Sequence, residues 1–261
     1  MERGAEAAER RYEEKSLMLD KRQEEYKVFE AVLDRPTLEG VYRLIQQKVI
    51  DEIHGVVKTG KEARIYWGRD PKGGELAIKI YYTSTAEFRK GMMKYIEGDS
   101  RFKRVRRDPR GIVYTWTQKE YSNLQLAEGA GVNAPRPVAF HRNILVMTFI
   151  GENGVPAPLL REVDLEDPDD FYNRLIREMR LLYTKAGLVH GDLSEYNVMV
   201  WEEAPVIFDV SQSLLTNHPL SEPLIRRDVE NVNLYFSRLG VEVYDPEELE
   251  PWVKGESEDL S

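Results

Sequence analysis

The chain has 261 residues, 32% of them charged, and a net charge of −9 at neutral pH, which suits a single acidic domain with a sizeable core. The absence of cysteine excludes disulfides and thiolate metal sites and is compatible with a cytoplasmic protein. No apolar run approaches the ~20 residues needed to cross a bilayer, and the charged N-terminus is unlike a signal peptide, so no membrane partner is expected.

Residues 1–27 are rich in Glu, Arg, Lys and Ala and predict a charged N-terminal extension exposed to solvent. From residue 28 onward, apolar residues recur at helical spacing, with an interruption at Pro36. These helical segments are expected to pack on the domain that follows.

Residues 53–82 predict three strands joined by two turns. The first turn contains Thr59, Gly60 and Lys61. Gly55 to Lys61 has the glycine spacing of a Walker A loop, but Glu follows in place of Ser or Thr, and a strand follows in place of a helix. We therefore reject a P-loop. The turn instead predicts a hairpin that covers nucleotide phosphates, with backbone donors at Thr59 and Gly60.

The third strand, residues 76–81, is apolar except for Lys79 near its centre. Burying an unpaired ammonium group is costly, so a buried Lys79 requires a partner. One interpretation is a kinase lysine that binds the α- and β-phosphates of ATP and is held by a glutamate on the next helix. The alternative is an edge-strand lysine that points to solvent.

Residues 83–114 are interpreted as a flexible basic insert, because residues 101–110 contain six basic side chains in an otherwise acidic chain. Such a segment indicates contact with phosphate or RNA, and binding through it would depend strongly on salt. The alternative is a surface loop whose arginines pair with the protein's own acidic residues.

Thr117 to Glu120 has the spacing of a capping box and predicts the start of a helix that runs to about Glu128. Glu120 is the candidate partner of Lys79, with Glu128 as a rival. The capping role alone would also explain Glu120.

Residues 143–151 predict a strand that ends in glycine. In a two-lobed kinase, the segment after this strand is the hinge between the lobes, whose backbone binds adenine. Met147, Thr148 and Ile150 would then line the base pocket. Taken alone, the segment is equally compatible with a core strand.

A helix is predicted from Asp167 to Gly187, and it leads into a segment with the spacing H-x-D-x-x-x-x-N that contains Asp192 and Asn197. Asp209 follows at the end of an apolar strand. Phosphoryl transfer requires this pattern, since one carboxylate orients a hydroxyl nucleophile while an amide and a second carboxylate hold Mg²⁺ on the phosphates of ATP. The alternative is a polar turn between two strands.

His190, at the start of this motif, is expected to support the backbone of the loop and not to act as a base. Only 52 residues follow Asp209, and we predict one helix among them, from Pro223 to about Leu239, with Ser221 as its N-cap. The Asp-Phe-Gly and Ala-Pro-Glu motifs of ordinary protein kinases are missing. A platform for diverse peptides is therefore not expected, which favours autophosphorylation or ATP hydrolysis.

In combination, these segments resemble the RIO family of atypical serine protein kinases, and within it the archaeal members of the type-one subfamily. The resemblance covers roughly residues 30–240, and is carried by Lys61 and the two residues after it, the Lys79 strand, and the segments 95–102, 156–160, 190–197 and 207–212.

The resemblance implies an α+β, two-lobed, protein-kinase-like fold. The N-lobe would be β-rich with one long helix, and the truncated helical C-lobe would lack the peptide-docking helices. The expected parts are the extension 1–27, the N-terminal helices and N-lobe 28–147, and the hinge and C-lobe 148–261, with one catalytic domain overall.

The resemblance also implies roles for single residues. Asp192 would be the catalytic base, Asn197 and Asp209 would bind Mg²⁺, with Mn²⁺ as a substitute, and Lys79 would bind the phosphates of ATP. Asp209 could itself accept the phosphoryl group, because a carboxylate is an accepted phosphoryl nucleophile, and this would give an aspartyl-phosphate and an ATPase cycle.

The family further implies a role in late maturation of the small ribosomal subunit, with pre-ribosomal RNA or protein as a partner. Two other functions are compatible with the motifs. A small-molecule phosphotransferase shares the His-Gly-Asp sequence, although little chain remains here for an acceptor pocket. A ribosome-associated pseudokinase would use nucleotide only as a structural ligand, although the four intact site residues argue against lost chemistry. Neither the phosphoacceptor nor the oligomeric state follows from the sequence.

Overall fold

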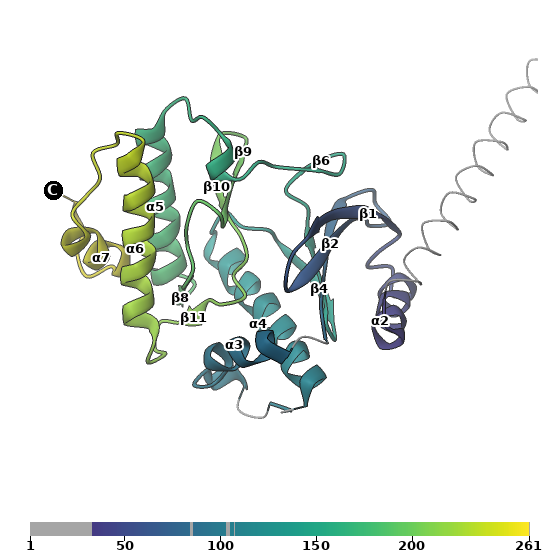
Figure 1. Ribbon diagram of the computed structural model, residues 1–261. Helices are drawn as coiled ribbons and strands as arrows, with labels where there is room; N and C mark the ends of the chain where they lie inside the picture. The colour runs from purple at the N-terminus through teal and green to yellow at the C-terminus, as the bar shows by residue number, and fades with distance from the viewer. Residues whose placement is uncertain (1–32, 84–85, 103–104, 107, 261) are drawn as a thin grey trace, which may run out of the picture.

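The computed structural model describes residues 33–83, 86–102, 105–106 and 108–260. The extension predicted at residues 1–27 lies outside the described residues. Figure 1 shows a β-sheet with a helix on its outer face, a group of helices on the opposite side of the molecule, and one long helix between the two. This is the predicted two-lobed, mixed α+β arrangement.

The N-lobe is built on a five-stranded antiparallel sheet with the strand order β1-β2-β3-β5-β4. Helix α2 (Arg35–Gln46) covers one face and packs Val41 and Leu44 into the core beneath it. Pro36 lies in the first turn of α2, where a missing N–H costs nothing, so it starts the predicted helix and does not break it. The strands are β1 (Glu52–Thr59), β2 (Ala63–Arg69), β3 (Glu75–Tyr81), β4 (Pro137–His141) and β5 (Ile144–Thr148).

Strand β3 lies in the middle of the sheet, between β2 and β5, and is buried from Leu76 to Tyr81. Because side chains alternate along a strand, Ile78 and Ile80 join the core beneath α2, and Lys79 lies on the opposite face. The alternative of an edge-strand lysine was therefore wrong.

A tight turn joins β2 to β3. Asp70 closes it by accepting hydrogen bonds from the N–H groups of Lys72 and Gly74, both at 2.8 Å. Residues 71–74 are exposed to solvent. The turn fixes the register of the strand that carries Lys79 without contributing to the core.

The stretch predicted as a flexible insert is largely helical. It contains α3 (Ala86–Ile96) and the short 3₁₀ helix η1 (Ser100–Phe102), and α4 (Pro109–Ala130) begins inside it. The predicted start of α4 at Thr117 was therefore wrong. Asp108 caps the helix by accepting from the Gly111 N–H at 3.1 Å. The Thr117 hydroxyl donates to a carbonyl one turn earlier in the same helix, so the predicted capping box does not form.

The described arginines of the basic stretch pair with acidic residues of the protein itself. Arg106 lies 2.9 Å from Asp108, and Arg110 lies 3.5 Å from Asp34. Arg101 is likewise paired with an aspartate, as described below. These contacts favour the alternative in which the positive charge is compensated within the chain.

The C-lobe contains α5 (Pro168–Thr184), α6 (Ser221–Arg238) and α7 (Pro246–Lys254), which lie together on the far side of the molecule from the sheet (Figure 1). Helix α5 begins after Asp167 as predicted. Ser221 is not the N-cap of α6 but its first residue, and its hydroxyl donates to the Thr216 carbonyl at 2.8 Å. Helix α7 was not predicted.

Short elements connect these helices to the site. They are β6 (Gly151–Glu152), β7 (Val155–Pro156), η2 (Leu160–Glu162), β8 (Leu188–Val189), β9 (Val198–Trp201), β10 (Ala204–Ile207) and β11 (Leu214–Leu215). Strands β9 and β10 form a hairpin that places the H-x-D motif before it and Asp209 after it. Within the described part of the chain, no helix is both long and apolar enough to span a membrane.

Candidate active site

Lys79 lies between two carboxylates where the lobes meet. Its Nζ donates to Glu120 Oε1 at 2.7 Å and to Asp209 Oδ1 at 2.8 Å. Glu120 comes from α4, and Asp209 comes from the segment after β10. The predicted ion pair between Lys79 and Glu120 is present, and the rival Glu128 lies about two turns further along the helix.

These contacts control the charge of the site. Burial alone would lower the pKa of Lys79, but Asp209 and then Glu120 outweigh burial and raise it well above its ordinary value. Burial alone would raise the pKa of Asp209, but the Lys79 ammonium outweighs it and holds this pKa below its ordinary value. Tyr81 donates its hydroxyl to the other oxygen of Glu120. At neutral pH, Lys79 is therefore a fixed cation and Asp209 is an ionised carboxylate.

The backbone of Asp209 is in the left-handed region, with φ of 59°. This conformation costs a non-glycine residue roughly 1–3 kcal/mol and persists where the surroundings enforce it. Both Lys79 and the Ser211 hydroxyl donate to Oδ1, so Oδ2 is used by neither. The side chain is 41% exposed, which leaves the carboxylate accessible from the cleft.

The loop that carries Asp192 is held through its backbone. His190 Nε2 donates to the Phe208 carbonyl at 3.0 Å, and its Nδ1 accepts from the Asp192 N–H at 3.3 Å, which confirms the supporting role expected for His190. Asp228, buried on α6, accepts from the N–H groups on either side of Asp192 at 2.7 and 2.9 Å. The Asp192 side chain itself is half exposed, with Arg227 at 3.8 Å.

Asn197 and Asp209 fit the requirements of Mg²⁺. The Phe208 N–H donates to the Asn197 carbonyl at 3.1 Å, so the two backbone segments are joined. The Asn197 amide nitrogen donates to the Asp192 carbonyl at 2.7 Å, which turns the amide oxygen away from that bond. Among the described residues, no group of three or more His, Cys, Asp or Glu side chains could hold a metal alone. Mg²⁺ commonly takes one or two protein ligands and completes its shell with phosphates and water, so an amide oxygen and a carboxylate would be enough protein ligands.

Two cavities that share lining residues occupy the cleft between the lobes, with volumes of about 200 and 240 Å³. The first is lined by Gly60 and Lys61 from the turn after β1 and by the charged residues Lys79, Glu120 and Asp209. The second is mostly apolar, and all three predicted hinge residues line it: Met147, Thr148 and Ile150.

A compartment lined by several charged side chains and a mostly apolar compartment suit the phosphates and the base of a nucleotide. Three predicted residues line neither cavity. Thr59 ends β1 just before the lining turn, and Asp192 and Asn197 lie on the loop outside both cavities.

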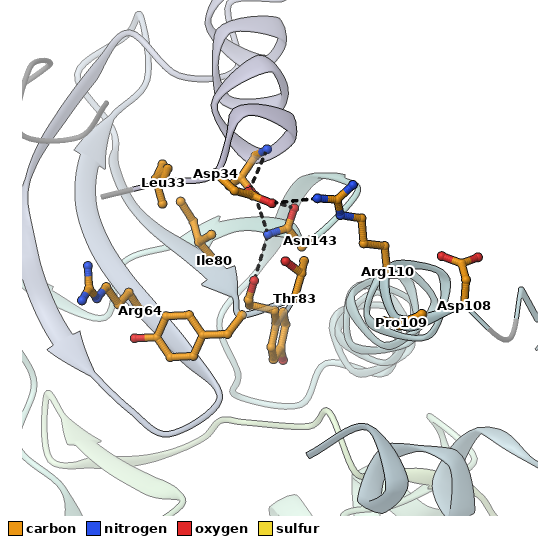
Figure 2. Close-up of a pocket in the computed structure, with 12 residues that line it drawn as sticks. Leu33, Asp34, Arg64, Ile80, Thr83, Asp108, Pro109, Arg110 and Asn143 are labelled. Carbon is orange, nitrogen blue, oxygen red and sulfur yellow. Dashed lines mark hydrogen bonds and ion pairs between the residues drawn. The ribbon is translucent and has the colours of Figure 1, made fainter. Parts of the chain in front are cut away.

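A larger cavity, of about 640 Å³, lies on the other side of the N-lobe between α2, β3 and the start of α4. Figure 2 shows Arg110 pointing towards Asp34 at its edge, with Asn143 beside them. None of the predicted site residues lines it. Apart from Thr59, the residues predicted to bind the phosphates and the base instead line the smaller cavities in the interlobe cleft.

The comparison with known families identifies the family of this fold. A model of the RIO domain matches residues 64–249. The chain belongs to the RIO family. The resemblance stated from the motifs is thereby confirmed.

Curated RIO relatives align over most of this chain. The RIO-type serine/threonine-protein kinase Rio1 of Haloferax volcanii is 38% identical over 233 residues, which cover 89% of this chain and 79% of that protein. Rio1 of Methanocaldococcus jannaschii is 39% identical over 219 residues, 84% of this chain and 74% of that protein. The human serine/threonine-protein kinase RIO1 is 39% identical over 228 residues, but these cover only 40% of the human protein.

A solved RIO kinase has the same fold. The Rio2 kinase of Chaetomium thermophilum, in an ADP/Mg²⁺-phosphoaspartate complex, superposes with a TM-score of 0.63 at 23% identity, covering 83% of this chain and 64% of that chain. This likeness confirms the predicted kinase-like fold.

Several residues that shape the site were not predicted. Glu62 lines the charged cavity, and Asp228 holds the Asp192 loop. Lys119 and Asn123, on α4, bind carbonyls in the segment after Asp209. Asp228 left a signal in the sequence, because it lies on the buried face of α6, where a carboxylate needs partners. Glu62 directly follows the predicted Lys61, and Lys119 directly precedes the predicted Glu120, whereas Asn123 is brought to the site by the tertiary fold.

Proposed function

We propose that this RIO protein is an ATP- and Mg²⁺-dependent serine/threonine protein kinase that phosphorylates itself and hydrolyses ATP. The observation that carries this proposal is the position of Lys79 between Glu120 and Asp209, at the polar end of a cleft with an apolar compartment for the base. Membership of the RIO family supports the same conclusion, since its curated relatives are named serine/threonine-protein kinases.

Each residue has a role that follows from its surroundings. Lys79 would bind the phosphates, and Glu120 would hold it in place. The backbone of Gly60 and Lys61, and of Thr59 at the strand end, would cover the phosphates. Met147, Thr148 and Ile150 would contact adenine.

Asp192 would orient the acceptor hydroxyl and take its proton, for which its half-exposed carboxylate is accessible. Asn197 and Asp209 would hold Mg²⁺, which supplies neutralisation of the phosphate charge when bound. Mn²⁺ could substitute for it.

Asp209 is also the proposed acceptor of a phosphoryl group. Its ionised carboxylate would attack the γ-phosphorus, the bond to the leaving oxygen of ADP would break, and water would later hydrolyse the aspartyl-phosphate to regenerate the carboxylate. The accessible side chain supports this step, as does Oδ2, which is bound by neither Lys79 nor Ser211. The phosphoaspartate named for the Chaetomium thermophilum Rio2 complex supports it as a reaction of the fold family.

The test is incubation with γ-labelled ATP and Mg²⁺ without added acceptor. Label that is lost to hydroxylamine and absent in Asp209→Ala would support the aspartyl-phosphate. Acid-stable label on serine that is lost in Asp192→Ala would support self-phosphorylation. Lys79→Ala should lose both signals. If wild type gives neither label nor phosphate release, the pseudokinase alternative replaces this proposal.

The family resemblance leads us to include a role in late maturation of the small ribosomal subunit, with its precursor RNA or protein as a partner. Co-sedimentation with purified archaeal small subunits, with ATP or ADP present, tests this role. Binding that changes between the two nucleotides would support an ATPase switch, and no binding in either state would contradict it.

A further inference from the structure

The 3₁₀ helix η1 and the turn before it carry a buried ion pair that the proposed chemistry does not use. The Arg101 guanidinium donates from Nε to Asp99 Oδ1 at 2.9 Å and from Nη2 to Oδ2 at 2.6 Å. The Asp99 carboxylate is fully buried. This two-point contact fixes the plane and direction of the guanidinium.

The fixed guanidinium reaches α4. Arg101 Nη2 also donates to Asn123 Oδ1 at 2.9 Å, and Asn123 is completely buried. The Asn123 amide nitrogen donates in turn to the carbonyls of Val210, at 2.8 Å, and Ser213, at 3.0 Å. A continuous series of hydrogen bonds therefore runs from Asp99 to the segment that follows Asp209.

A lysine on the same helix binds the same segment. Lys119 Nζ donates to the Ser211 carbonyl at 3.0 Å and to the Ser213 carbonyl. The carbonyls of residues 210, 211 and 213 are thus all bound by side chains of α4. The Ser211 hydroxyl donates to Asp209 Oδ1, so the same segment also contacts the carboxylate directly.

The turn before η1 is attached to the C-lobe as well. His218 Nε2 donates to the Glu97 carbonyl at 2.9 Å. Gly98 has φ of 92°, and a Cβ there would lie 2.6 Å from His218 Nε2, so only glycine permits this approach. Residues 97–101 are therefore held against both lobes.

We propose that Arg101 is a positioning residue for the metal-binding segment, acting through Asn123. This inference rests on one part of the proposed function, namely that Asp209 binds Mg²⁺. Arg101 has only donors, so the Asn123 amide oxygen must face it, and the amide nitrogen must then face the two carbonyls. Without Arg101, the buried amide oxygen loses its donor, and only the bonds to the two carbonyls would still hold the amide in this orientation.

Arg101→Ala tests this role, and Arg106→Ala is its matched control. Arg106 also pairs with an aspartate two residues away in sequence, but its side chain is 81% exposed and its partner Asp108 does not contact the segment after Asp209. Calorimetric titration with ADP, with and without Mg²⁺, measures how much Mg²⁺ tightens nucleotide binding. We expect Arg101→Ala to lose about tenfold of this tightening, equivalent to ~1.4 kcal/mol, with little change in metal-free binding.

Three further variants distinguish a positioning role of Arg101 from a general effect of the substitution. Arg101→Lys keeps a cation with several donors and should recover part of the loss. Asn123→Asp keeps the shape but replaces the donating nitrogen by an oxygen, and should lose at least as much as Arg101→Ala. Arg106→Ala should behave as wild type. Equal loss of ADP affinity with and without Mg²⁺ would overturn the proposal, because it would indicate a general folding defect.

A second measurement is independent of the metal assignment. Hydrogen exchange of the nucleotide-free protein should be faster at residues 210–214 in Arg101→Ala, and unchanged there in Arg106→Ala. If wild type shows no effect of Mg²⁺ on ADP binding, the proposed function fails, and the exchange result alone decides whether Arg101 positions the segment. Wild-type exchange at these residues in Arg101→Ala would overturn the inference.

Discussion

Glu62, in the turn after β1, lies near the carboxylates of Asp209 and Glu120. Burial, and then the Asp209 carboxylate, raise the pKa of Glu62 to about 7. A carboxyl group in this position is half protonated near neutral pH, directly beside the cavity assigned to phosphates. Since bound phosphate is anionic, it favours the protonated form, and nucleotide binding near pH 7 should take up protons.

We therefore expect the dissociation constant of metal-free ADP to rise as the pH is raised from 6 to 8. The rise should be roughly three- to tenfold larger in wild type than in Glu62→Gln. Glu62 gains its charge over this range, whereas glutamine stays neutral. Both proteins share the titration of ADP itself, so the ratio of their dissociation constants isolates Glu62. A ratio that stays constant from pH 6 to 8 would show that Glu62 does not titrate in the site.

Helix α6 holds the Asp192 loop in place through the side chain of Asp228. The carboxylate accepts two backbone N–H groups of the Asp192 loop, and an asparagine could accept only one of them while its NH₂ faced the other. Asp228→Asn should therefore lower the free energy of unfolding by about 1–3 kcal/mol and reduce kcat more than it raises KM for ATP.

The matched control is Asp245→Asn, which alters a carboxylate that caps α7 from the surface and accepts the Glu247 N–H at 2.8 Å. Asparagine is as good an N-cap as aspartate, so this change should have little effect. Chemical denaturation and steady-state kinetics measure both variants. Wild-type kcat in Asp228→Asn would mean that the other contacts of the loop, including those of His190 and Asn197, hold it adequately.

Local sequence signals predicted several of the main elements but placed the start of α4 too late and missed α3 and α7. The Thr117–Glu120 spacing looked like a helix start, yet Asp108 and the proline after it are the true start of α4. The basic composition of residues 101–110 concealed this helix start, because the charge suggested a segment exposed to solvent. Helix α7 has the same Asp-Pro start at Asp245 and was overlooked in the short C-terminal stretch.

Some residues of the candidate site could likewise be predicted from local sequence motifs, whereas others come together only in the folded chain. Lys79, Asp192, Asn197 and Asp209 could be found because phosphoryl transfer restricts both their type and their spacing. Arg101, by contrast, was named only as part of a basic stretch and of the resemblance segment 95–102, with no role of its own. No spacing rule connects it to Asn123, because the two meet through the packing of η1 on α4.

At the scale of the whole molecule, α4 links the lobes through buried polar contacts. Lys119 extends from this helix to two carbonyls of the C-lobe and is completely buried. Burial, and then the guanidinium of Arg101, lower the pKa of Lys119 from 10.5 to about 7. The contact between the lobes therefore contains an amine whose charge changes near neutral pH.

This shift makes stability depend on pH in a defined direction. Between pH 7 and 10.5 an unfolded Lys119 holds a proton that the folded protein releases, so the unfolded state binds more protons. The contribution of Lys119 to the free energy of unfolding must then rise with pH across this window, and the full cost of burial applies below pH 7. Lys119→Met removes this dependence, although it also removes two hydrogen bonds.

Urea denaturation at pH 7, 8 and 9 tests the prediction. The difference in free energy of unfolding between wild type and Lys119→Met should grow steadily in favour of wild type. Lys254→Met is the control, since the pKa of Lys254 is raised by its hydrogen bond to Glu222 and this lysine stays charged in the window. Parallel profiles for wild type and Lys119→Met would contradict a shifted pKa.

The turn between β2 and β3, which Asp70 closes, is a suitable place to attach a probe. It is exposed, it joins the strands that set the position of Lys79, and its side chains take no part in the core. Since the chain has no cysteine, Lys72→Cys would create a single thiol for attaching a fluorophore or spin label. The label would sit at the tip of the β2–β3 hairpin, where it could report movement of the N-lobe while leaving every residue of the cleft unmodified.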